Sequence, residues 1–545
     1  MRPIAALAIV LALASSLQAA PAPAPVAEIS DPNVPDGPLR VRVRGGSVPV
    51  EHFAGTRYAR IAIDGPTTIE ITSPVPIGSA VLLPSRLGLV PVVRGRVLKF
   101  SLASVRDVIV QVDNLEPLAL FADTVLTLPR APGAAVHIPR GHGRRARAAA
   151  RAAMRAAARA VREPGRSVVE FGADPTGRRL ATRAFQTAID SLSGGGDTLR
   201  VPAGVFRTGG LSIRRALTLW LAPGARIVGS EDPADYAVPP GAVEPDLRGA
   251  FDAATRGTRL SYTQLILIAN ANGVTIAGRG TIDGSGAALR RLGRHPMLLR
   301  VMDSRRVRVE DVILRNPAGW NSHVLRSEDV VFRRVRLLGD PAELNNDGID
   351  PDGSRRVWID GCFVSTGDDA VAIKSTGHGG AATDVDTVLV HDCVLRTRKS
   401  AMKIGTESRC AAMRAITFAR NDVIEADRAI SLYCRDQARI ERIVFEDNRV
   451  DGWTPGGTAQ VIDAEVRPRD GPPGVIRDVR IRDLWVSQPA PVASSLRGLD
   501  AQHPIAGVRF EGVVIAGRPC ASAAALPLKT NAFARDVMFA ASAPR

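Results

Sequence analysis

The densest group of carboxylates in this 545-residue chain lies in the stretch LNNDGIDPDGSRRVWIDGCFVSTGDDAVAIKS. Asp347 precedes Asp368 by 21 positions and Asp369 by 22 positions. Isolated surface aspartates usually meet solvent or form turns, whereas three brought together repel one another and raise the pKa of at least one carboxyl group. General acid catalysis needs such a raised pKa. We therefore predict that these three aspartates are catalytic. Asp350 and Asp352 are weaker candidates, as turn formers or as hydrogen-bonding partners of a sugar.

These aspartates must be positioned by a repeating element. Short runs of alternating apolar residues recur along the chain, 23 to 36 residues apart; they begin at Val274, Val307, Val330, Val357, Val388, Ile416, Ile443, Val479 and Val508. A period of this size built from short strands is typical of a solenoid. We predict an all-β fold, with a right-handed parallel β-helix over residues 166–545. Its rungs stack about 4.8 Å apart, so residues one rung apart become neighbours.

A rung of about 22 residues brings Asp347, Asp368 and Asp369 onto adjacent rungs, on the outer surface of the coil. Cys362 and Cys393 fall in the same phase of consecutive rungs. We interpret them as stacked core residues, and a disulfide between them is the alternative.

The region before the β-helix divides into four segments. Residues 1–20 read as a signal peptide, with Arg2 before an apolar run, and residues 21–37 as a Pro/Ala-rich spacer. A retained membrane anchor is the alternative to export into the periplasm or the extracellular space. Residues 38–131 alternate apolar and polar positions, which predicts a small antiparallel β-sandwich that acts as a spacer or sugar-binding accessory. Residues 132–165 are predicted as an Arg/Ala-rich helical linker.

The composition excludes several classes of protein. Five cysteines are too few and too widely spaced for a disulfide scaffold or a CxxC zinc site, and no internal apolar run reaches the length of a membrane span. The formal net charge of +16 could attract nucleic acid or an acidic polysaccharide, or could simply reflect codon usage. Since no nucleic-acid-binding motif is present, we expect no nucleic-acid partner. We expect a polysaccharide or oligosaccharide substrate, no membrane span, and a monomer.

Several motifs carry a resemblance to a known family. They are SVVEFGADPTGRRLATRAFQTAID, VPAGVFRTGGL, LAPGARIVGS, GRGTIDGSG, NNDG at Asn345–Gly348 and GDD at Gly367–Asp369. In this order the set resembles glycoside hydrolase family 28, the polygalacturonases, over residues 167–450. The resemblance implies a pectin-lyase-like β-helix and an inverting hydrolase that uses no cofactor and no metal.

The resemblance also assigns roles. Asp368 would be the general acid that protonates the leaving glycosidic oxygen, and Asp347 and Asp369 would hold and deprotonate the attacking water. Asn345 would position these carboxylates or the sugar. Such a mechanism needs opposed carboxylates with room for a water molecule.

Two departures from the family concern recognition of an acidic sugar. Lys399-Ser400-Ala401 stands where the family has Gly-His-Gly, and we interpret the literal Gly377-His378-Gly379 as an unrelated loop; a loop that reaches back to the site is the alternative. Ser431 and Tyr433 stand where the family's Arg-Ile-Lys grips the galacturonate carboxylate. Arg435, Lys403 or Lys399 could supply replacement charge. We infer an altered glycan specificity rather than lost activity.

Further binding candidates flank the aspartates. Trp320 could stack on a sugar face, and both Trp320 and His323 could line the cleft; the alternative is a packed tryptophan and a surface histidine whose hydrogen bonds are satisfied. Lys374 is expected to contact substrate or pair with a carboxylate, and Tyr433 to face the cleft. The hydrolase is predicted to act on pectic, galacturonan-like glycans. The alternatives are a neutral-glucan hydrolase resembling dextranase or isopullulanase, a Ca²⁺-dependent polysaccharide lyase, and a non-catalytic glycan-binding solenoid.

Overall fold

The computed structural model describes residues 39–124, 165–192, 197–236, 263–378, 380–469 and 471–540. The predicted signal peptide, the spacer, and the Arg/Ala-rich segment up to residue 164 lie outside these residues. No helix in the described ranges is both long enough and apolar enough to cross a lipid bilayer.

Two five-stranded sheets form the N-terminal unit, a β-sandwich. In spatial order the first contains β2 (Gly46–Val48), β1 (Arg40–Val43), β5 (Thr67–Thr72), β8 (Val97–Leu102) and β7 (Val92–Arg94). The second contains β3 (Glu51–Phe53), β4 (Thr56–Ile63), β10 (Leu118–Thr124), β9 (Val108–Val112) and β6 (Ala80–Leu83); the 3-10 turn η1 (Ser85–Leu87) follows β6. All pairs are antiparallel, as predicted, except β10 with β4, which run parallel.

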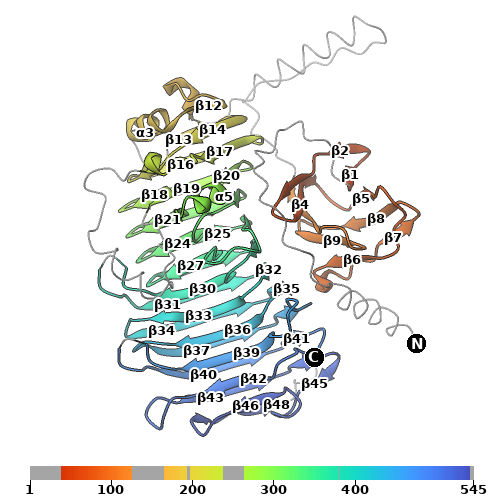
Figure 1. Cartoon of the computed structure of the whole chain (residues 1–545), viewed down its shortest axis with the longest axis vertical. Helices are drawn as coiled ribbons and strands as arrows, with labels where there is room; N and C mark the ends of the chain where they lie inside the picture. The colour runs from red at the N-terminus through yellow and green to blue at the C-terminus, as the bar shows by residue number, and fades with distance from the viewer. Residues whose placement is uncertain are drawn as a thin grey trace, which may run out of the picture.

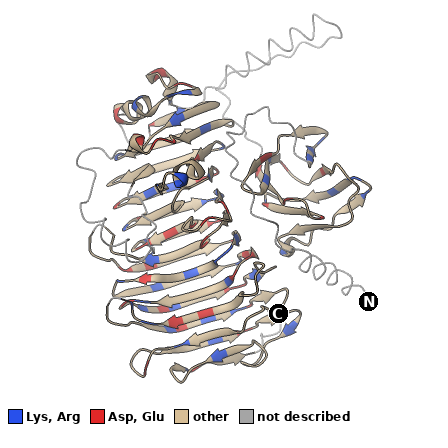
Figure 2. Cartoon of the chain, viewed as in Figure 1, with Lys and Arg blue, Asp and Glu red and all other residues tan. Residues whose placement is uncertain are grey.

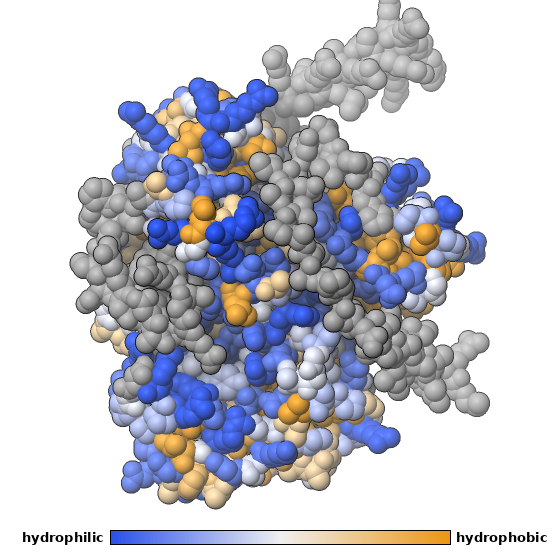
Figure 3. All heavy atoms as spheres, in the orientation of Figure 1, coloured by the Kyte–Doolittle hydropathy of each residue, from blue (hydrophilic) through white to orange (hydrophobic). Residues whose placement is uncertain are grey.

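The alternation of the sequence accounts for the sandwich. Ile69 and Ile71 of β5 point into the core and lie opposite Phe100 and Leu98 of β8, while the residues between them face outward. At the outer edge, Val92 of β7 is 55% exposed, and Figure 3 shows apolar surface on this side of the sandwich.

The rest of the described chain is the predicted parallel β-helix (Figure 1). Each coil contributes one strand in turn to each of three sheets. The first sheet comprises β11 (Arg166–Ser167), β13 (Thr198–Val201), β16 (Leu217–Leu221), β19 (Asn272–Gly278), β22 (Arg305–Glu310), β25 (Glu328–Arg333), β28 (Arg355–Asp360), β31 (Val385–His391), β34 (Ala412–Ala419), β37 (Arg439–Glu446), β40 (Val475–Arg482), β43 (Ile505–Glu511), β47 (Ala534–Arg535) and β48 (Met538–Ala540).

The other two sheets carry the active-site turns between them. The second sheet comprises β12 (Thr176–Leu180), β14 (Gly204–Thr208), β17 (Ala225–Gly229), β20 (Thr281–Asp283), β23 (Ile313–Arg315), β26 (Arg336–Leu338), β29 (Phe363–Thr366), β32 (Val394–Thr397), β35 (Asp422–Glu425), β38 (Arg449–Val450), β41 (Trp485–Val486), β44 (Val514–Ile515) and β45 (Arg518–Pro519). The third comprises β15 (Leu211–Ile213), β18 (Gln264–Ala269), β21 (Met297–Met302), β24 (Ser322–Leu325), β27 (Ile349–Asp352), β30 (Val371–Ser375), β33 (Ser400–Ser408), β36 (Arg428–Cys434), β39 (Gln460–Val466), β42 (Ser494–Arg497) and β46 (Leu528–Thr530).

The predicted repeats are confirmed residue by residue in the first sheet. The nine residues that begin the repeats pair in register from one rung to the next, from Val274 with Val307 through to Val479 with Val508. Variation in repeat length is therefore confined to the turns and loops between strands, and the stack itself is regular. Lys/Arg and Asp/Glu residues are interspersed along its strands (Figure 2).

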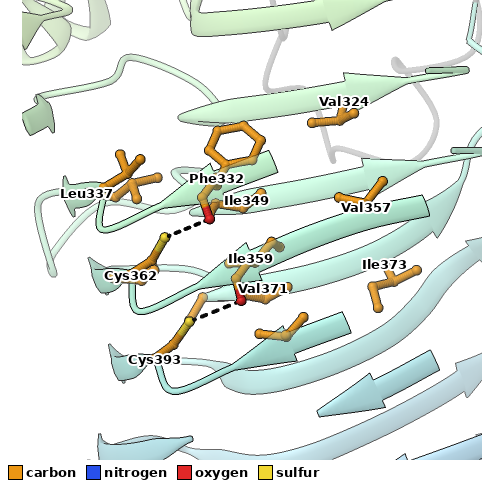
Figure 4. Packing of buried hydrophobic residues seen from close by; sticks show 14 of the residues in the cluster. Val324, Phe332, Leu337, Ile349, Val357, Ile359, Cys362, Val371, Ile373 and Cys393 are labelled. Atoms are coloured by element: carbon orange, nitrogen blue, oxygen red, sulfur yellow. Dashed lines mark hydrogen bonds between the residues drawn. The ribbon is translucent and has the colours of Figure 1, made fainter. Parts of the chain in front are cut away.

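The interior of the coil is dry and apolar, as the inward Val, Ile and Leu positions predicted. Cys362 and Cys393 are buried free thiols in this core, which confirms their interpretation as stacked core residues. The Sγ atom of each lies 3.6 Å from a backbone oxygen of the rung before it, that of Phe332 or of Ile359 (Figure 4).

Short helices supplement the coil. The 3-10 turn η2 (Val168–Phe171) and helix α3 (Thr182–Ser191) lie at its N-terminal end, where Phe185, Ala188 and Ile189 of α3 cover the open end of the apolar core. A solenoid needs such a cap because its last rung would otherwise expose apolar surface. Elsewhere in the described part of the coil, η3 (Pro233–Tyr236) and α5 (Gly286–Arg291) are also helical. None of these helices was predicted from the sequence.

The sandwich packs against the outer face of the second sheet. Phe121 of β10 contacts Phe363 of β29, with ring centroids 5.1 Å apart, inside a shared apolar cluster. Beside it, the guanidinium group of Arg336 is 1% exposed and pairs with Asp107 and Asp123 of the sandwich, each at 3.0 Å. A buried, fully paired cation of this kind fixes one orientation of the two surfaces.

Candidate active site

The three predicted aspartates lie in consecutive turns that lead from the second sheet to the third. Asp347 precedes β27, and Asp368 and Asp369 precede β30. The Gly348 amide donates to the Asp369 carbonyl at 2.9 Å, and Ile349 pairs with Val371, so Asp347 is stacked directly on Asp369. One carboxylate oxygen from each of the three aspartates lies within 4.8 Å of the others. The sequence spacing therefore predicted their convergence correctly.

Glycines beside these aspartates allow the rungs to approach closely. A Cβ atom added at Gly348 would lie 2.3 Å from the Ala370 oxygen, and one at Gly367 would lie 2.1 Å from the Glu343 oxygen. Both distances are far below van der Waals contact with backbone atoms that cannot move independently. The glycines of the NNDG and GDD motifs are thus required by packing rather than by chemistry.

Asp368 is held by a network of backbone hydrogen bonds. Its carboxylate accepts from the amide of Asn345 at 2.9 Å and from that of Asp369 at 3.0 Å. The side-chain oxygen of Asn346 accepts from the amides of Gly367 and Asp368. Asn345 was predicted to position the aspartates, and its main chain does so. The buried Asn346, which the sequence analysis passed over, fixes the turn itself.

The Lys374 side chain forms an ion pair with Asp347. Its ammonium group is 2.6 Å from Asp347 Oδ2, 3.6 Å from Asp350 Oδ1 and 3.7 Å from the centre of the Trp320 ring. Burial raises the pKa of Asp347 to about 7; the Lys374 charge opposes this shift and the neighbouring aspartates add to it. Burial would lower the pKa of Lys374, but its two carboxylate neighbours outweigh burial and raise it.

Asp369 has a different environment. Lys403 Nζ lies 2.5 Å from Asp369 Oδ2, and the Ser400 amide donates to Asp369 Oδ1 at 3.1 Å. Burial alone would raise the pKa of Asp369, but the charges of Lys403 and Lys374 outweigh it and lower the pKa below its ordinary range. Two carboxylates stacked on each other thus have pKa values shifted in opposite directions, an arrangement that assigns different protonation states to neighbouring acids.

The structure corrects the prediction that the cluster lies on the outer surface. Asp347 and Asp369 are outside the apolar core, but each is only 3% exposed, and Asp368 is half-buried. Trp320 and His323 do not line the cleft as predicted. Trp320 is 5% exposed and supports Lys374, while His323 is fully buried. Since sequence alternation reports only which side of a strand a residue occupies, it could not reveal that later loops cover this side.

His323 belongs to a buried polar network. Its Nε2 atom lies 2.9 Å from Asp352 Oδ2, and Asp352 also accepts from the backbone amide and hydroxyl of Thr376. His378 packs beside Trp320 and His323, with ring centroids 6.3 and 6.2 Å away. Its loop therefore does reach back toward the site, contrary to our interpretation of it as unrelated. Burial lowers the pKa of His323 to about 4 and of His378 to about 3, so both rings are neutral.

Asp350 is a buried acid beside this network. It is fully buried, and neither carboxyl oxygen has a hydrogen-bond partner among the described residues. Burial raises its pKa well above the ordinary range. The group is therefore a buried acid next to Lys374, rather than the turn former or sugar ligand that the sequence suggested.

Ser431 and Tyr433, which stand where the family has Arg and Lys, carry hydroxyl groups. Ser431 donates to Ser400 at 2.9 Å, and the Tyr433 hydroxyl donates to Asp463 at 2.6 Å. Arg435 is paired with Glu465 at 2.5 Å. Of the three suggested sources of replacement charge, Arg435 and Lys403 are thus already neutralised. Lys399 is half-buried and forms no ion pair with a described residue.

Two residues near the aspartates were not anticipated. Glu407, on β33, pairs with Arg469 at 3.2 Å, and its charge acts on Lys374 and Lys403. Arg290 of α5 contacts the turn that carries Asn345. Neither residue was among the predicted site residues.

Two clusters here contain residue types that bind metals: the three aspartates, and His323 with Asp352 and His378. The aspartates already share two ammonium groups, and Asp352 already accepts three hydrogen bonds. Ca²⁺ takes about six to eight oxygen ligands. A set of carboxylates occupied by lysines fits this requirement poorly.

The sequence model of Glycosyl hydrolases family 28 matches residues 242–431, which include all three aspartates. A Vitis vinifera protein named as a probable polygalacturonase is 28% identical over 375 residues, which cover 64% of this chain and 74% of that protein. The chain is a glycoside hydrolase that is similar to the members of family 28. An exo-poly-alpha-D-galacturonosidase of Dickeya chrysanthemi is 26% identical over 256 residues, 38% of this chain and 41% of that enzyme.

Solved structures agree with this fold. The Yersinia enterocolitica family 28 exopolygalacturonase superposes with a TM-score of 0.56 at 15% identity and covers 90% of this chain and 98% of its own. The Thermotoga maritima exopolygalacturonase gives a TM-score of 0.53 at 22% identity, over 65% of this chain and 87% of its own. At these identities the likeness concerns the β-helix fold alone.

Proposed function

We propose that the protein hydrolyses glycosidic bonds in pectic, galacturonan-containing polysaccharides by an inverting single displacement. The observation that carries this proposal is the convergence of the Asp347, Asp368 and Asp369 carboxylates within 4.8 Å. The names of the relatives, which include a polygalacturonase and an exo-poly-alpha-D-galacturonosidase, support the substrate class.

In the proposed reaction Asp368 donates its proton to the glycosidic oxygen as the bond to the anomeric carbon breaks. Asp347 and Asp369 hold a water molecule and take its proton as its oxygen attacks that carbon. The half-buried position of Asp368 supports the assignment, because the acid must reach the leaving oxygen, whereas the more deeply buried pair needs to reach only water.

The stereochemical part of the proposal rests on the family. Inverting pairs of carboxyl groups are commonly about 6.5–9.5 Å apart. The nearest oxygens here lie within 4.8 Å. Inversion is therefore inferred from the family resemblance and not from this separation, and the anomer of the first product must be determined directly.

The test compares the wild type with Asp368→Asn and with Asp329→Asn, a control on β25 in the first sheet. Reducing ends released from polygalacturonan are measured, and NMR follows the product anomer. Loss of the general acid should lower kcat by about 10²–10⁴-fold, while the control should keep wild-type activity. An Asp368→Asn variant as active as the control, or retention of the anomeric configuration, would refute the proposal.

A second candidate substrate class has its own support. Three of the cations on the C-terminal side of the aspartates are paired, which leaves Lys399 outside these ion pairs: Arg435 pairs with Glu465, Arg428 with Asp427, and Lys403 with Asp369. Hydroxyl groups of Ser431 and Tyr433 replace the cations that grip a uronate. A neutral sugar would suit this surface, so a neutral α-glucan belongs in the substrate panel. An ultraviolet-absorbing product that disappears with chelator would instead identify a lyase.

We also propose export, on the strength of the apolar N-terminal segment alone. Fractionation of expressing cells, followed by N-terminal sequencing of the exported chain, tests it: cleavage near residue 20 is expected, and an uncleaved intracellular chain would refute it.

A further inference from the structure

Arg290 lies at the edge of the active site and has no part in the chemistry described above. It is near the end of α5, which is fixed to the coil because Leu289 is buried in the apolar core. The Arg290 side chain is only 9% exposed. A guanidinium group is seldom taken out of water without a reason, since its desolvation must be offset by its partners.

The partners of Arg290 belong to the turn that holds the general acid. Its Nη1 atom donates to the Leu344 carbonyl at 2.9 Å and pairs with Glu343 Oε2 at 3.1 Å. The next amide along this turn, that of Asn345, donates to Asp368 Oδ2 at 2.9 Å. Two contacts therefore connect the guanidinium group to the catalytic carboxyl group.

The turn that contains Glu343 and Asn345 is also held in place by the following rung. The Glu343 carbonyl lies where a Cβ atom of Gly367 would be, and Asn346 ties the turn to the amides of Gly367 and Asp368. Arg290 contacts the turn from α5, whereas the GDD turn contacts it from the following rung. Displacing the turn would move the Asn345 amide, and the orientation of Asp368 with it.

The remaining donors of Arg290 argue against a purely structural ion pair. Its Nε and Nη2 atoms are buried and have no hydrogen-bond partner among the described residues. Leaving buried donors unpaired destabilises the folded state. In addition, the charge of Asp368 is among those that act on Arg290. Its Glu343 partner is more exposed, at 43%, and does not reach Asp368 itself.

We propose that Arg290 is a positioning residue, which holds the Asp368 carboxyl group through the Glu343–Asn345 segment in the orientation needed for proton transfer. This rests on the proposed function of Asp368 as general acid. Arg290 does not act on the substrate itself. Its effect is therefore on kcat and on the pH dependence, and not on substrate binding.

The test uses Arg290→Met, Arg290→Lys and the matched control Arg291→Met, which changes the neighbouring exposed arginine of the same helix. Misplacing a reacting group can cost about 10²-fold in rate, so Arg290→Met should lower kcat by about 10- to 100-fold. Its KM should stay within about threefold of the wild-type value, since uniform binding is untouched. The alkaline limb of its pH–rate profile should differ from that of the Arg291→Met control, because a positive charge beside the active-site carboxyl groups is lost. Arg290→Lys should restore the limb but not the full kcat.

Amide hydrogen exchange of the peptide that spans residues 340–346 gives a readout that needs no substrate. Arg290→Met should speed exchange there by about tenfold, and Arg291→Met should not. Unchanged exchange, or changed exchange with kcat and pH limb as in the control, would overturn the proposal. If the wild type hydrolyses no glycan in the panel, the proposed function fails, while the exchange result still decides whether Arg290 holds the turn.

Discussion

Replacing Lys374 by Met removes the cation beneath Asp347 while keeping a side chain of similar length. At the observed separation of 2.6 Å, an effective dielectric constant of about 20 gives roughly 6 kcal/mol of Coulomb attraction. Asp347 can escape most of this loss by binding a proton, since its pKa is already about 7 with the lysine present. The cost of the substitution should therefore depend on pH.

The direction in which the destabilisation by Lys374→Met changes with pH follows from the protonation of Asp347. At pH 5 the carboxyl group in Lys374→Met is neutral, and the free energy of unfolding should fall by less than about 2 kcal/mol. At pH 8 the loss should be larger, about 3–5 kcal/mol, because the folded variant must either keep Asp347 protonated far above the pKa that this group has in the unfolded chain or bury it as a carboxylate without its cation. Stability of the variant should thus decrease relative to wild type as pH rises through this range.

Urea unfolding at several pH values measures this, with Lys529→Met as a control because Lys529 is an exposed lysine of the same sheet. Adding Asp347→Asn to Lys374→Met should recover stability at pH 8, since no buried charge then remains. At neutral pH the single variant should also lose about 10²-fold in kcat, because the water-activating carboxylate is protonated. A destabilisation equal at pH 5 and pH 8, or no larger than that of the control, would refute the reasoning.

Three further outcomes follow from the structure. Asp350→Asn should change kcat by less than about threefold and leave the pH–rate profile unmoved, since burial raises the pKa of this acid and disfavours its ionised form; a large loss of kcat would show that its ionised form is used. Gly367→Ala should lower kcat by about 10²-fold through displacement of the acid turn, and circular dichroism should show the β-helix intact; full activity would contradict the packing argument. Arg336→Met should cost about 3–5 kcal/mol in urea unfolding, because Asp107 and Asp123 stay buried without a cation; an unchanged midpoint would mean that the pairing contributes nothing.

The extent of agreement with the sequence has a physical explanation. The repeat starts and the Asp347–Asp369 stacking were predictable because both depend on register, and register follows from the alternation of apolar residues. The apolar phase likewise identified Cys362 and Cys393 as core residues.

What the sequence could not reveal depends on turns and loops. The burial of Trp320 and His323 depends on the path of the segment around His378, and the contact of Arg290 with Leu344 depends on the conformation of a turn. Neither the segment nor the turn has a repeating sequence pattern from which its conformation could be predicted. The same holds for Asn346, which is adjacent to the predicted Asn345 but fixes the acid turn through its side chain instead of its backbone.

The firm attachment of the sandwich has a consequence for how a long polymer could be handled. An accessory domain on a flexible linker can bind a second site on the same polysaccharide chain and so keep an enzyme near its substrate. Here contacts of Arg336 and Phe121 fix the sandwich to the outer face of the second sheet. The two units must therefore approach a polysaccharide together, and any sugar contact that the sandwich adds would lie at a fixed distance and angle from the three aspartates.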